Sequence, residues 1–356
     1  MHLEFNINYF IFFSSISFFI TFLAAKYSKF FFSGSLLDKD FLKPQAFHEE
    51  PIARIGGLVI LLLFIVVLIF YFVISGVFLK EYFTLTLLLF FLGFLDDLKI
   101  KISPNLRLIL MLLALLACIN IFSIEVNRSG LEFLDSWLKN NIFQVCFVLL
   151  CFLFIINGAN LVDGFNGLLA IHFLLINSIF LLINLANQNE STAIILFLQI
   201  IIVLSFLLFN FPKAKIFLGD SGSYLLGTLI ALNAIRTYEL NVSVSPFFFA
   251  CVLFYLFYEV FFSFIRKIFT KVSPLKPDGK HLHMLLYNWL LNSKKIIKPN
   301  YLTSLIINLT YLLFQIPLFY FQTDGFVLRY CFFLLIGLYM LIYTRLYSFS
   351  KKQIDI

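Results

Sequence analysis

Runs of about twenty apolar residues recur along the whole chain, and they constrain the fold more than any other feature. Each run is long enough to cross the roughly 30 Å hydrocarbon core of a bilayer as a helix. Only 13% of the 356 residues are charged and 62% are hydrophobic, whereas about a quarter of the residues in a soluble domain are charged. The sequence therefore predicts an all-α polytopic membrane protein.

About eleven membrane-spanning helices can be drawn from these runs, and residues 1–356 are expected to form a single integral-membrane domain. If the N-terminus lies outside, the Lys and Arg residues concentrate on one set of loops, and that set is predicted to be cytoplasmic. Of the 26 Lys and Arg residues, the other side receives only Lys80, Arg128, Lys139, Arg236 and Arg329. The expected spans are residues 8–28, 55–75, 81–96, 105–123, 141–157, 167–187, 192–210, 222–240, 246–266, 299–321 and 326–346.

The net charge of +7 comes largely from these cytoplasmic loops. It favours contact with anionic lipid heads and phosphorylated substrates. No basic segment is large enough to form a nucleic-acid-binding module, so nucleic acid is not an expected partner. The longest soluble segment, about residues 267–298, is too short to enclose a hydrophobic core. The five Cys lie inside apolar runs without metal-ligand spacing and are interpreted as small hydrophobic residues.

Short polar motifs stand at the cytoplasmic ends of the predicted spans. Before the second span, Gly56 and Gly57 permit close backbone approach, and Arg54 can bind a phosphate or carboxylate. An interfacial arginine that follows the positive-inside rule would look the same. At the end of the third span, Asp96 and Asp97 are adjacent acids that repel each other unless a cation intervenes. The pair suits a divalent metal or a base beside one, although it also fits an acidic membrane boundary.

The segment Asn157-Gly-Ala-Asn-Leu-Val-Asp-Gly-Phe-Asn-Gly167 has three Asn, one Asp and three Gly in eleven positions. Its Asp-Gly and Asn-Gly pairs are typical of turns, and Asn157 and Asn160 would share a helix face. Asn and Asp side chains form hydrogen bonds without demanding full charge compensation, which suits a nucleotide or sugar. A plain tight turn would need only about two such residues.

The next motif extends from Asn210 to Gly227, and its Asp220 stands at the start of the eighth span. A carboxylate on a glycine-flanked turn beside lysines fits a Mg²⁺–phosphate site. The same acid would also complement the dipole of the helix that it begins. Phe217 is positioned to stack on a base.

The last motif is the Pro-Asp-Gly-Lys-His-Leu-His segment of the largest cytoplasmic loop. Two histidines, His281 and His283, are a weak metal signal by themselves, but beside Asp278 and Lys280 they suit a diphosphate. Glu259 lies about two turns inside the ninth span, and acids at such depth are functional suspects.

Together these motifs would place carboxylates for Mg²⁺, cations and glycine turns for phosphates at one membrane surface. Such groups are the machinery of phosphoryl transfer. The position at the membrane boundary indicates one water-soluble substrate and one lipid phosphate.

In their order, the motifs resemble the polyprenyl-phosphate N-acetylhexosamine-1-phosphate transferase family. That family includes the enzymes that start O-antigen and teichoic-acid synthesis and the phospho-MurNAc-pentapeptide translocase of peptidoglycan synthesis. The resemblance covers essentially the whole chain, and the Pro-Asp-x-x-His-Leu-His segment is more similar to the O-antigen and capsule branch. The matching stretches are PIARIGG, FLGFLDDLKIKISPNLRL, NGANLVDGFNGL, NFPKAKIFLGDSGSYLLG and PDGKHLHMLLY.

The resemblance implies a role for each motif. Asp220 would be the Mg²⁺ ligand, with Mn²⁺ as an alternative ion. Asp96 and Asp97 would act at the lipid-phosphate end, with Asp163 as a further catalytic candidate that also lines the nucleotide-sugar site. The other residues implied in nucleotide-sugar binding are Asn157, Asn160, Asn166, Asn210, Phe217, His281 and His283. Lys43 and Arg54 are the candidates for the lipid phosphate.

The implied reaction is attack by undecaprenyl phosphate on the β-phosphorus of a UDP-N-acetylhexosamine. UMP leaves, and a polyprenyl diphosphate-linked sugar forms at the bacterial cytoplasmic (inner) membrane as the first membrane step of cell-surface polysaccharide synthesis. Whether an aspartate acts as a base or as a covalent nucleophile is left open, as is the oligomeric state, for which a homodimer is one candidate.

Two residues depart from the family pattern. Asn166 stands where many relatives carry Asp, and Met284 stands where relatives often carry a further histidine. Two alternatives within the family are a phospho-MurNAc-pentapeptide transferase and a structural relative that has lost its chemistry. A multispan transporter of anionic substrates is an alternative from another class.

Overall fold

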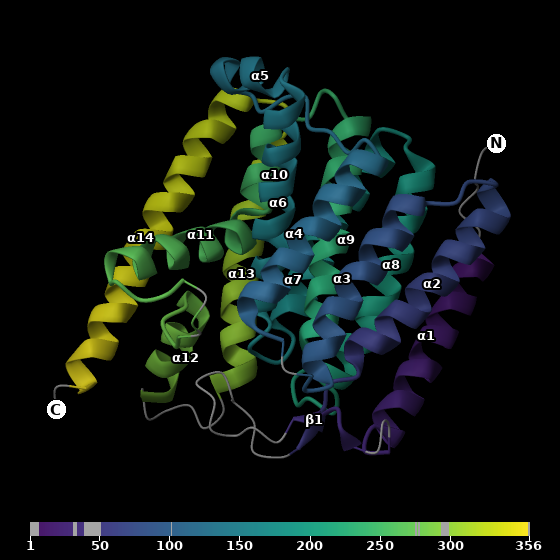
Figure 1. Ribbon diagram of the computed structural model, residues 1–356, viewed down its shortest axis with the longest axis horizontal. Helices are drawn as coiled ribbons and strands as arrows, with labels where there is room; N and C mark the ends of the chain where they lie inside the picture. The colour runs from purple at the N-terminus through teal and green to yellow at the C-terminus, as the bar shows by residue number, and fades with distance from the viewer. Residues whose placement is uncertain are drawn as a thin grey trace.

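Helices make up nearly all the regular structure of this protein in the computed structural model shown in Figure 1. The structure describes residues 7–30, 34–38, 51–100, 102–274, 276, 278–292 and 299–354. Within them lie two short strands, β1 (Leu37–Asp38) and β2 (Ile52–Ala53), and the following helices. They are α1 (Ile7–Tyr27), α2 (Gly56–Ser75), α3 (Lys80–Asp97), α4 (Pro104–Ile121), α5 (Glu132–Leu138), α6 (Asn141–Val162), α7 (Leu168–Ala186), α8 (Glu190–Asn210), α9 (Gly219–Leu240), α10 (Pro246–Val252), α11 (Phe254–Phe269), α12 (Leu282–Asn292), α13 (Pro299–Tyr320) and α14 (Gly325–Ile354).

The predicted class, an all-α polytopic membrane protein, is confirmed. Among the described residues, eight helices are long and apolar enough to cross a membrane, and the bent pair α10–α11 would make a ninth. Helices α3 and α9 coincide with two further expected spans but do not pass this test, and α3 carries charged residues at both ends. The number eleven and the orientation therefore stay predictions.

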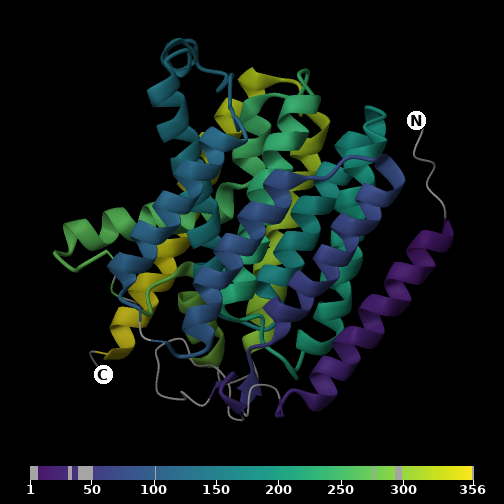
Figure 2. The same cartoon turned by 45° about the vertical axis from the view of Figure 1, so that its right-hand side comes forward.

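The ninth expected span, residues 246–266, differs from the prediction of one helix. It is broken after Val252, where α10 and α11 meet with a bend of 72°, and α11 lies across the direction of its neighbours (Figures 1 and 2). The carbonyls of Cys251 and Val252 accept hydrogen bonds from Gln315 and Tyr311 of α13, both at 3.0 Å. Because an unpaired carbonyl costs several kcal/mol in hydrocarbon, these two donors stabilise the bend.

Helix α9 lies at the centre of the bundle and approaches α2 and α3 closely at its first turn. A Cβ atom on Gly93 of α3 would lie 2.4 Å from the carbonyl oxygen of Asp220, and one on Gly57 of α2 would lie 2.4 Å from the amide nitrogen of Gly222. Small residues at helix crossings allow such contact between backbones. The start of α9 is therefore held against the start of α2 and the end of α3, at what we call the motif end of the bundle.

Short extended segments join the loops at the motif end. Strands β1 and β2 pair antiparallel, and Ala53 of β2 forms a parallel bridge to Ile216. The amides of Gly56 and Gly57 donate to the carbonyls of Phe217 and Leu218, each at 2.9 Å. The segment before α2 therefore lies beside the segment before α9, which brings two motifs together that are far apart in the chain.

Candidate active site

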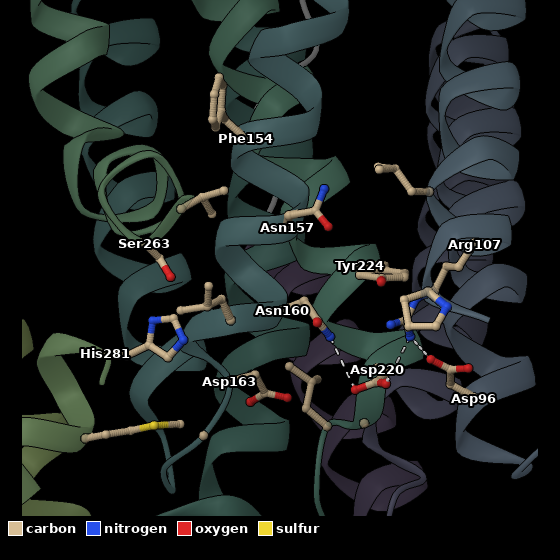
Figure 3. Close-up of a pocket in the computed structure, with 18 of the residues that line it drawn as sticks. Asp96, Arg107, Phe154, Asn157, Asn160, Asp163, Asp220, Tyr224, Ser263 and His281 are labelled. Carbon is tan, nitrogen blue, oxygen red and sulfur yellow. Dashed lines mark hydrogen bonds and ion pairs between the residues drawn. The ribbon is translucent and has the colours of Figure 1, made fainter. Parts of the chain in front are cut away.

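A cavity of about 770 Å³ opens at the motif end between α4, α6, α9 and α11. Its wall combines carboxylates, amides and cations with an apolar part, and Figure 3 shows some of the side chains that line it. Residues from all five sequence motifs therefore meet in one place. The predicted site residues that line the cavity are Arg54, Asp96, Asn157, Asn160, Asp163, Asn166, Asn210, Phe217, Asp220 and His281.

Asp220, in the first turn of α9, is held between an amide and a guanidinium. Its Oδ1 accepts a hydrogen bond from Asn160 at 3.2 Å, and its Oδ2 lies 3.7 Å from a guanidinium nitrogen of Arg107. Asn160 also donates to the hydroxyl of Ser223 at 2.9 Å. Figure 3 shows Asn160 and Arg107 on either side of Asp220. The carboxylate is thereby turned toward the cavity with a defined orientation.

Arg107 is a residue that the sequence-based reasoning missed as a site residue. It forms an ion pair with Asp96 and lies near Asp220 on the same wall of the cavity. It stands in the first turns of α4, whose start is capped by the Ser103 hydroxyl, which accepts from the amide of Leu106 at 3.2 Å. A Ser-Pro helix start soon after two aspartates was the available signal, because it places an early helical arginine beside them.

Asp97 faces away from the cavity and lies beneath the first turn of α9. Its carboxylate accepts hydrogen bonds from the amides of Asp220 and Ser221 at 3.0 and 2.9 Å and from the Ser221 hydroxyl at 2.6 Å. A carboxylate at a helix N-terminus satisfies free amides and complements the helix dipole. These contacts make Asp97 a residue that positions Asp220, and it is not among the residues that line the cavity.

Arg54 lines the cavity from the segment before α2. Its Nε and Nη2 donate to one oxygen of Asp38 at 3.1 and 2.7 Å, and its Nη1 lies 3.6 Å from Asp97. Burial opposes its charge, but the carboxylates of Asp220, Asp38 and Asp97 outweigh that effect and raise the pKa of Arg54. It therefore remains a fixed positive charge beside the cavity.

Lys43, the other candidate for the lipid phosphate, lies outside the described residues.

Asp163 follows the last residue of α6 and lines the cavity near its centre (Figure 3). Burial, followed by the negative charge of Asp220, raises the pKa of Asp163 to about 8. Arg54 acts in the opposite direction but is outweighed. The carboxyl group can therefore be either neutral or ionised near neutral pH.

Asn166 and Asn210 join the loop after α6 to the loop before α9. The Asn210 side chain accepts from the amide of Gly167 at 2.7 Å and donates to the carbonyl of Ile216 at 3.0 Å. Asn166 donates through its side chain to the carbonyl of Pro212 at 2.9 Å. Both residues line the cavity, but these hydrogen bonds join backbone groups of the two loops and so fix the loop conformations. An aspartate in place of Asn166 would have no hydrogen to donate to Pro212.

The two predicted histidines lie in different surroundings. His281 lines the cavity, whereas His283 is fully buried and is not among the lining residues. Its Nδ1 lies 3.2 Å from the hydroxyl of Tyr255, and its ring packs against Phe165. Burial lowers the pKa of His283 to about 3. His283 therefore supports the loop after α6 as a neutral side chain.

One wall of the cavity is apolar and extends along α4, α6 and α11 away from the acids. Phe154 and Asn157 mark this direction on α6, and Figure 3 shows Phe154 remote from Asp220. Asn157 donates to the carbonyl of Leu153 in its own helix at 2.8 Å. The apolar residues of these three helices that line the cavity are Leu108, Met111, Leu150, Leu153, Phe154, Leu161, Val260 and Phe264.

The acids of the cavity fit one mode of metal binding. Within the described part of the chain, no group of three or more His, Cys, Asp or Glu side chains is placed to hold a metal ion. Mg²⁺ commonly uses only one or two protein carboxylates and takes its other oxygens from substrate phosphates and water. Asp220, with Asp96 and Asp163 in the lining of the same cavity, supplies oxygen ligands of that kind.

Comparison with known proteins places the chain in a family. Residues 79–238 match the family described as glycosyl transferase family 4. The undecaprenyl-phosphate alpha-N-acetylglucosaminyl 1-phosphate transferase of Thermotoga maritima is 30% identical over 268 residues, which cover 75% of this chain and 77% of that protein. The chain belongs to glycosyl transferase family 4.

Two other similarities to curated proteins extend this result. The phospho-N-acetylmuramoyl-pentapeptide-transferase of Dictyoglomus turgidum is 30% identical over 318 residues, or 84% of this chain and 96% of that protein. A probable undecaprenyl-phosphate N-acetylglucosaminyl 1-phosphate transferase of Bacillus subtilis is 26% identical over 278 residues, or 74% of this chain and 73% of that protein. The family 4 match spans α3 to α9, so it includes Asp96, Arg107 and Asp220 but neither Arg54 nor His281.

Proposed function

We propose that the protein transfers a sugar 1-phosphate from a UDP-N-acetylhexosamine to undecaprenyl phosphate and releases UMP. The observation that carries the proposal is the cavity of a family 4 protein in which Asp96, Arg107 and Asp220 meet beside an apolar wall. The names of the three relatives above give different sugars, but each name describes the transfer of a phosphosugar. Two of the names also give undecaprenyl phosphate.

The two parts of the cavity suit two different substrates. The donor's sugar diphosphate would lie at the polar end, where Asn160 and His281 offer hydrogen bonds and Phe217 borders the space for a base. The acceptor's isoprenoid chain would lie along the apolar wall on α4, α6 and α11. Apolar burial would hold that chain, while Arg54 and Arg107 would attract its phosphate.

In the proposed reaction, an oxygen of the lipid phosphate attacks the β-phosphorus of the donor. A new P–O bond forms, the bond from the β-phosphorus to the bridging oxygen breaks, and UMP leaves with that oxygen. Arg107 and Arg54 would lower the repulsion between the two anions and align them, which is most of what such a displacement requires. Asp163, whose carboxyl group can be neutral or ionised near neutral pH, would take up a proton from the lipid phosphate.

We also propose that the reaction depends on Mg²⁺, with Mn²⁺ as a substitute. Asp220 would hold the ion, and Asn160 would keep the carboxylate oriented. When bound, the ion neutralises charge on the diphosphate and on the departing UMP.

A second candidate function is that of a phospho-N-acetylmuramoyl-pentapeptide transferase. The observation that favours it is the coverage of the Dictyoglomus turgidum relative, of which 96% is matched. We favour an N-acetylhexosamine donor and a role in O-antigen or capsule synthesis at the bacterial inner membrane, because the segment from Asp278 to His283 has two separated histidines.

Purified protein in detergent, incubated with undecaprenyl phosphate and Mg²⁺, tests the proposal through UMP release. The donor panel contains UDP-GlcNAc, UDP-GalNAc and UDP-MurNAc-pentapeptide. We expect release with at least one UDP-N-acetylhexosamine, loss of release with chelator, and a large loss of turnover in Asp220→Asn without unfolding. Release with UDP-MurNAc-pentapeptide alone would establish the second candidate. If folded protein releases no UMP from any donor, the transferase proposal is wrong.

A further inference from the structure

Glu259 of α11 is a buried acid that the proposed reaction does not use directly. Its exposed fraction is 1%, and it lies in the bent segment that follows α10. A carboxylate at such a depth is costly unless hydrogen bonds compensate its charge. Its contacts therefore indicate what the residue is for.

Both oxygens of Glu259 accept hydrogen bonds from other elements. Oε1 lies 3.0 Å from Nδ1 of His281 and 3.1 Å from the amide of Leu282, and Oε2 accepts from the hydroxyl of Tyr339 at 2.7 Å. Because a carboxylate only accepts, the bond to His281 requires a hydrogen on Nδ1. The carboxylate thus connects α11 with the start of α12 and with α14.

His281 carries this connection to the cavity. It is 3% exposed and lines the cavity, and Figure 3 shows it on the side opposite Arg107. With Nδ1 held by Glu259, Nε2 is the ring atom left for other contacts, and it lies 3.5 Å from Asp278. Asp278 is itself fixed by the guanidinium of Arg266 at 2.9 and 3.2 Å.

Other groups beside His281 or in the cavity lining also have fixed partners. The ring of His283 stacks on it with centroids 5.6 Å apart and an interplanar angle of 6°. The ammonium group of Lys267, another cavity residue, is held by the carbonyls of Pro274 and Lys276 at 3.1 and 2.7 Å. Glu259 lies closer to a ring nitrogen of His281, at 3.0 Å, than Asp278 does at 3.5 Å, so ring orientation depends on Glu259 most directly.

We propose that Glu259 is a positioning residue for the donor substrate and acts through His281. It fixes the hydrogen of His281 on Nδ1 and the plane of the ring, so that the ring presents one defined edge to the sugar diphosphate. The inference rests on the proposed function, because the donor is its substrate. A fixed carboxylate partner orients histidines in metal sites in the same way.

The experiment compares Glu259→Met with Glu259→Gln. Met removes every acceptor of the carboxylate and keeps much of the volume. Gln keeps one oxygen that can accept from His281, so it is the conservative variant. We expect Glu259→Met to raise the KM for the UDP-sugar about tenfold or more, with the KM for undecaprenyl phosphate little changed. Glu259→Gln should stay close to wild type.

A double-mutant cycle separates positioning from general structural support. In a His281→Ala background, Glu259→Met should have no further effect on the donor KM, because the residue through which it acts is gone. The same fold loss in both backgrounds, or no loss in wild type, would overturn the proposal. An equal loss in the Gln and Met variants would also overturn it, since charge and not orientation would then matter. Glu239→Met, at the far end of α9, is the control for removing a glutamate.

A readout without turnover keeps the test independent of the proposed function and of loss of folding. In protein labelled with ¹⁵N-histidine, the Nδ1–H resonance that disappears in His281→Ala belongs to His281. We expect this resonance in wild type and Glu259→Gln, and its loss in a Glu259→Met protein of unchanged size-exclusion profile. Absence of the resonance in wild type, or its persistence in Glu259→Met, would overturn the positioning role. By contrast, failure of wild type to release UMP would overturn only the proposed reaction.

Discussion

Asp96 and Asp97 follow one another in the chain but have different surroundings. Successive residues of an α-helix point about 100° apart, so the two carboxylates cannot face one cavity equally. Asp96 is in the cavity wall, paired with Arg107. The side chain of Asp97 is 0% exposed and binds the first turn of α9. A pair that suggests one acidic site in the sequence therefore divides into a cavity residue and a residue that supports Asp220.

We expect Asp97→Asn to lower the free energy of unfolding by about 1–3 kcal/mol. Asparagine has one oxygen for the three hydrogen bonds that Asp97 accepts, and it lacks the charge that complements the dipole of α9. Thermal unfolding in detergent measures the effect. Asp96→Asn is the matched control and should change turnover more than the unfolding midpoint. Equal destabilisation by the two variants would contradict this division of roles.

Helices α3 and α9 show how backbone approach positions the site. Gly93 lies against Asp220, and the contact leaves no room for a side chain. On the other side of the cavity, the break between α10 and α11 turns α11 toward the same space. The carbonyls of Cys251 and Val252 at the break accept hydrogen bonds from side chains of α13. The site therefore depends on two helix features, a tight crossing and a bend, and neither contributes a functional group itself.

We expect Gly93→Ala to lower turnover at least about tenfold and to lower the thermal midpoint, because the new Cβ would lie 2.4 Å from the Asp220 carbonyl oxygen and displace that turn. Gly337→Ala in α14 is the matched control, since no atom lies within 4 Å of its new Cβ. UMP release and thermal unfolding in detergent give the two measurements. Wild-type turnover in Gly93→Ala would show that the crossing tolerates a larger separation.

Across the molecule, buried amides join helices that are distant in the sequence. Asn233 of α9 accepts from the hydroxyl of Tyr82 at 2.9 Å and donates to Asn177 at 2.8 Å and Gln199 at 2.6 Å. These partners belong to α3, α7 and α8. Since lipid tails are as apolar as leucine, hydrogen bonds and close packing select which helices associate in a bilayer. The network lies outside the cavity and holds the bundle around α9.

We expect Asn233→Leu to lower the free energy of unfolding by about 1–2 kcal/mol while the KM for the donor stays within about twofold. The variant leaves the polar groups of Tyr82, Asn177 and Gln199 without their shared partner. Asn120→Leu is the control, because within the described residues the Asn120 side chain donates to the carbonyl of Leu116 in its own helix. Thermal unfolding and UMP release are measured on the same preparations. A large rise in donor KM would mean that the network also shapes the site.

Much of the cavity could be predicted without coordinates. Asp220, Asp163 and Asn160 stand in polar motifs at the ends of apolar runs, and a membrane accepts such groups at its boundary far more easily than at its centre. Arg107 was missed because an arginine in a basic loop region resembles an ordinary positive-inside residue, so the Ser-Pro helix start that places it beside the two aspartates was not used. His283 and Asp97 were expected at the substrates, but the motif pattern does not reveal which face of a turn is covered by other helices.

The sequence by itself determined the all-α membrane class, the approximate helix positions and the family-like set of motifs, because hydrophobic length and residue type are local properties. The tertiary structure decided which members of each motif face the cavity, where α10 bends into α11, and that Glu259 reaches His281. These features depend on contacts between residues far apart in the chain, such as the bond from Gln315 to Cys251, which no local pattern contains. Packing of helices around α9 turned a set of motifs into one site with a polar end and an apolar wall.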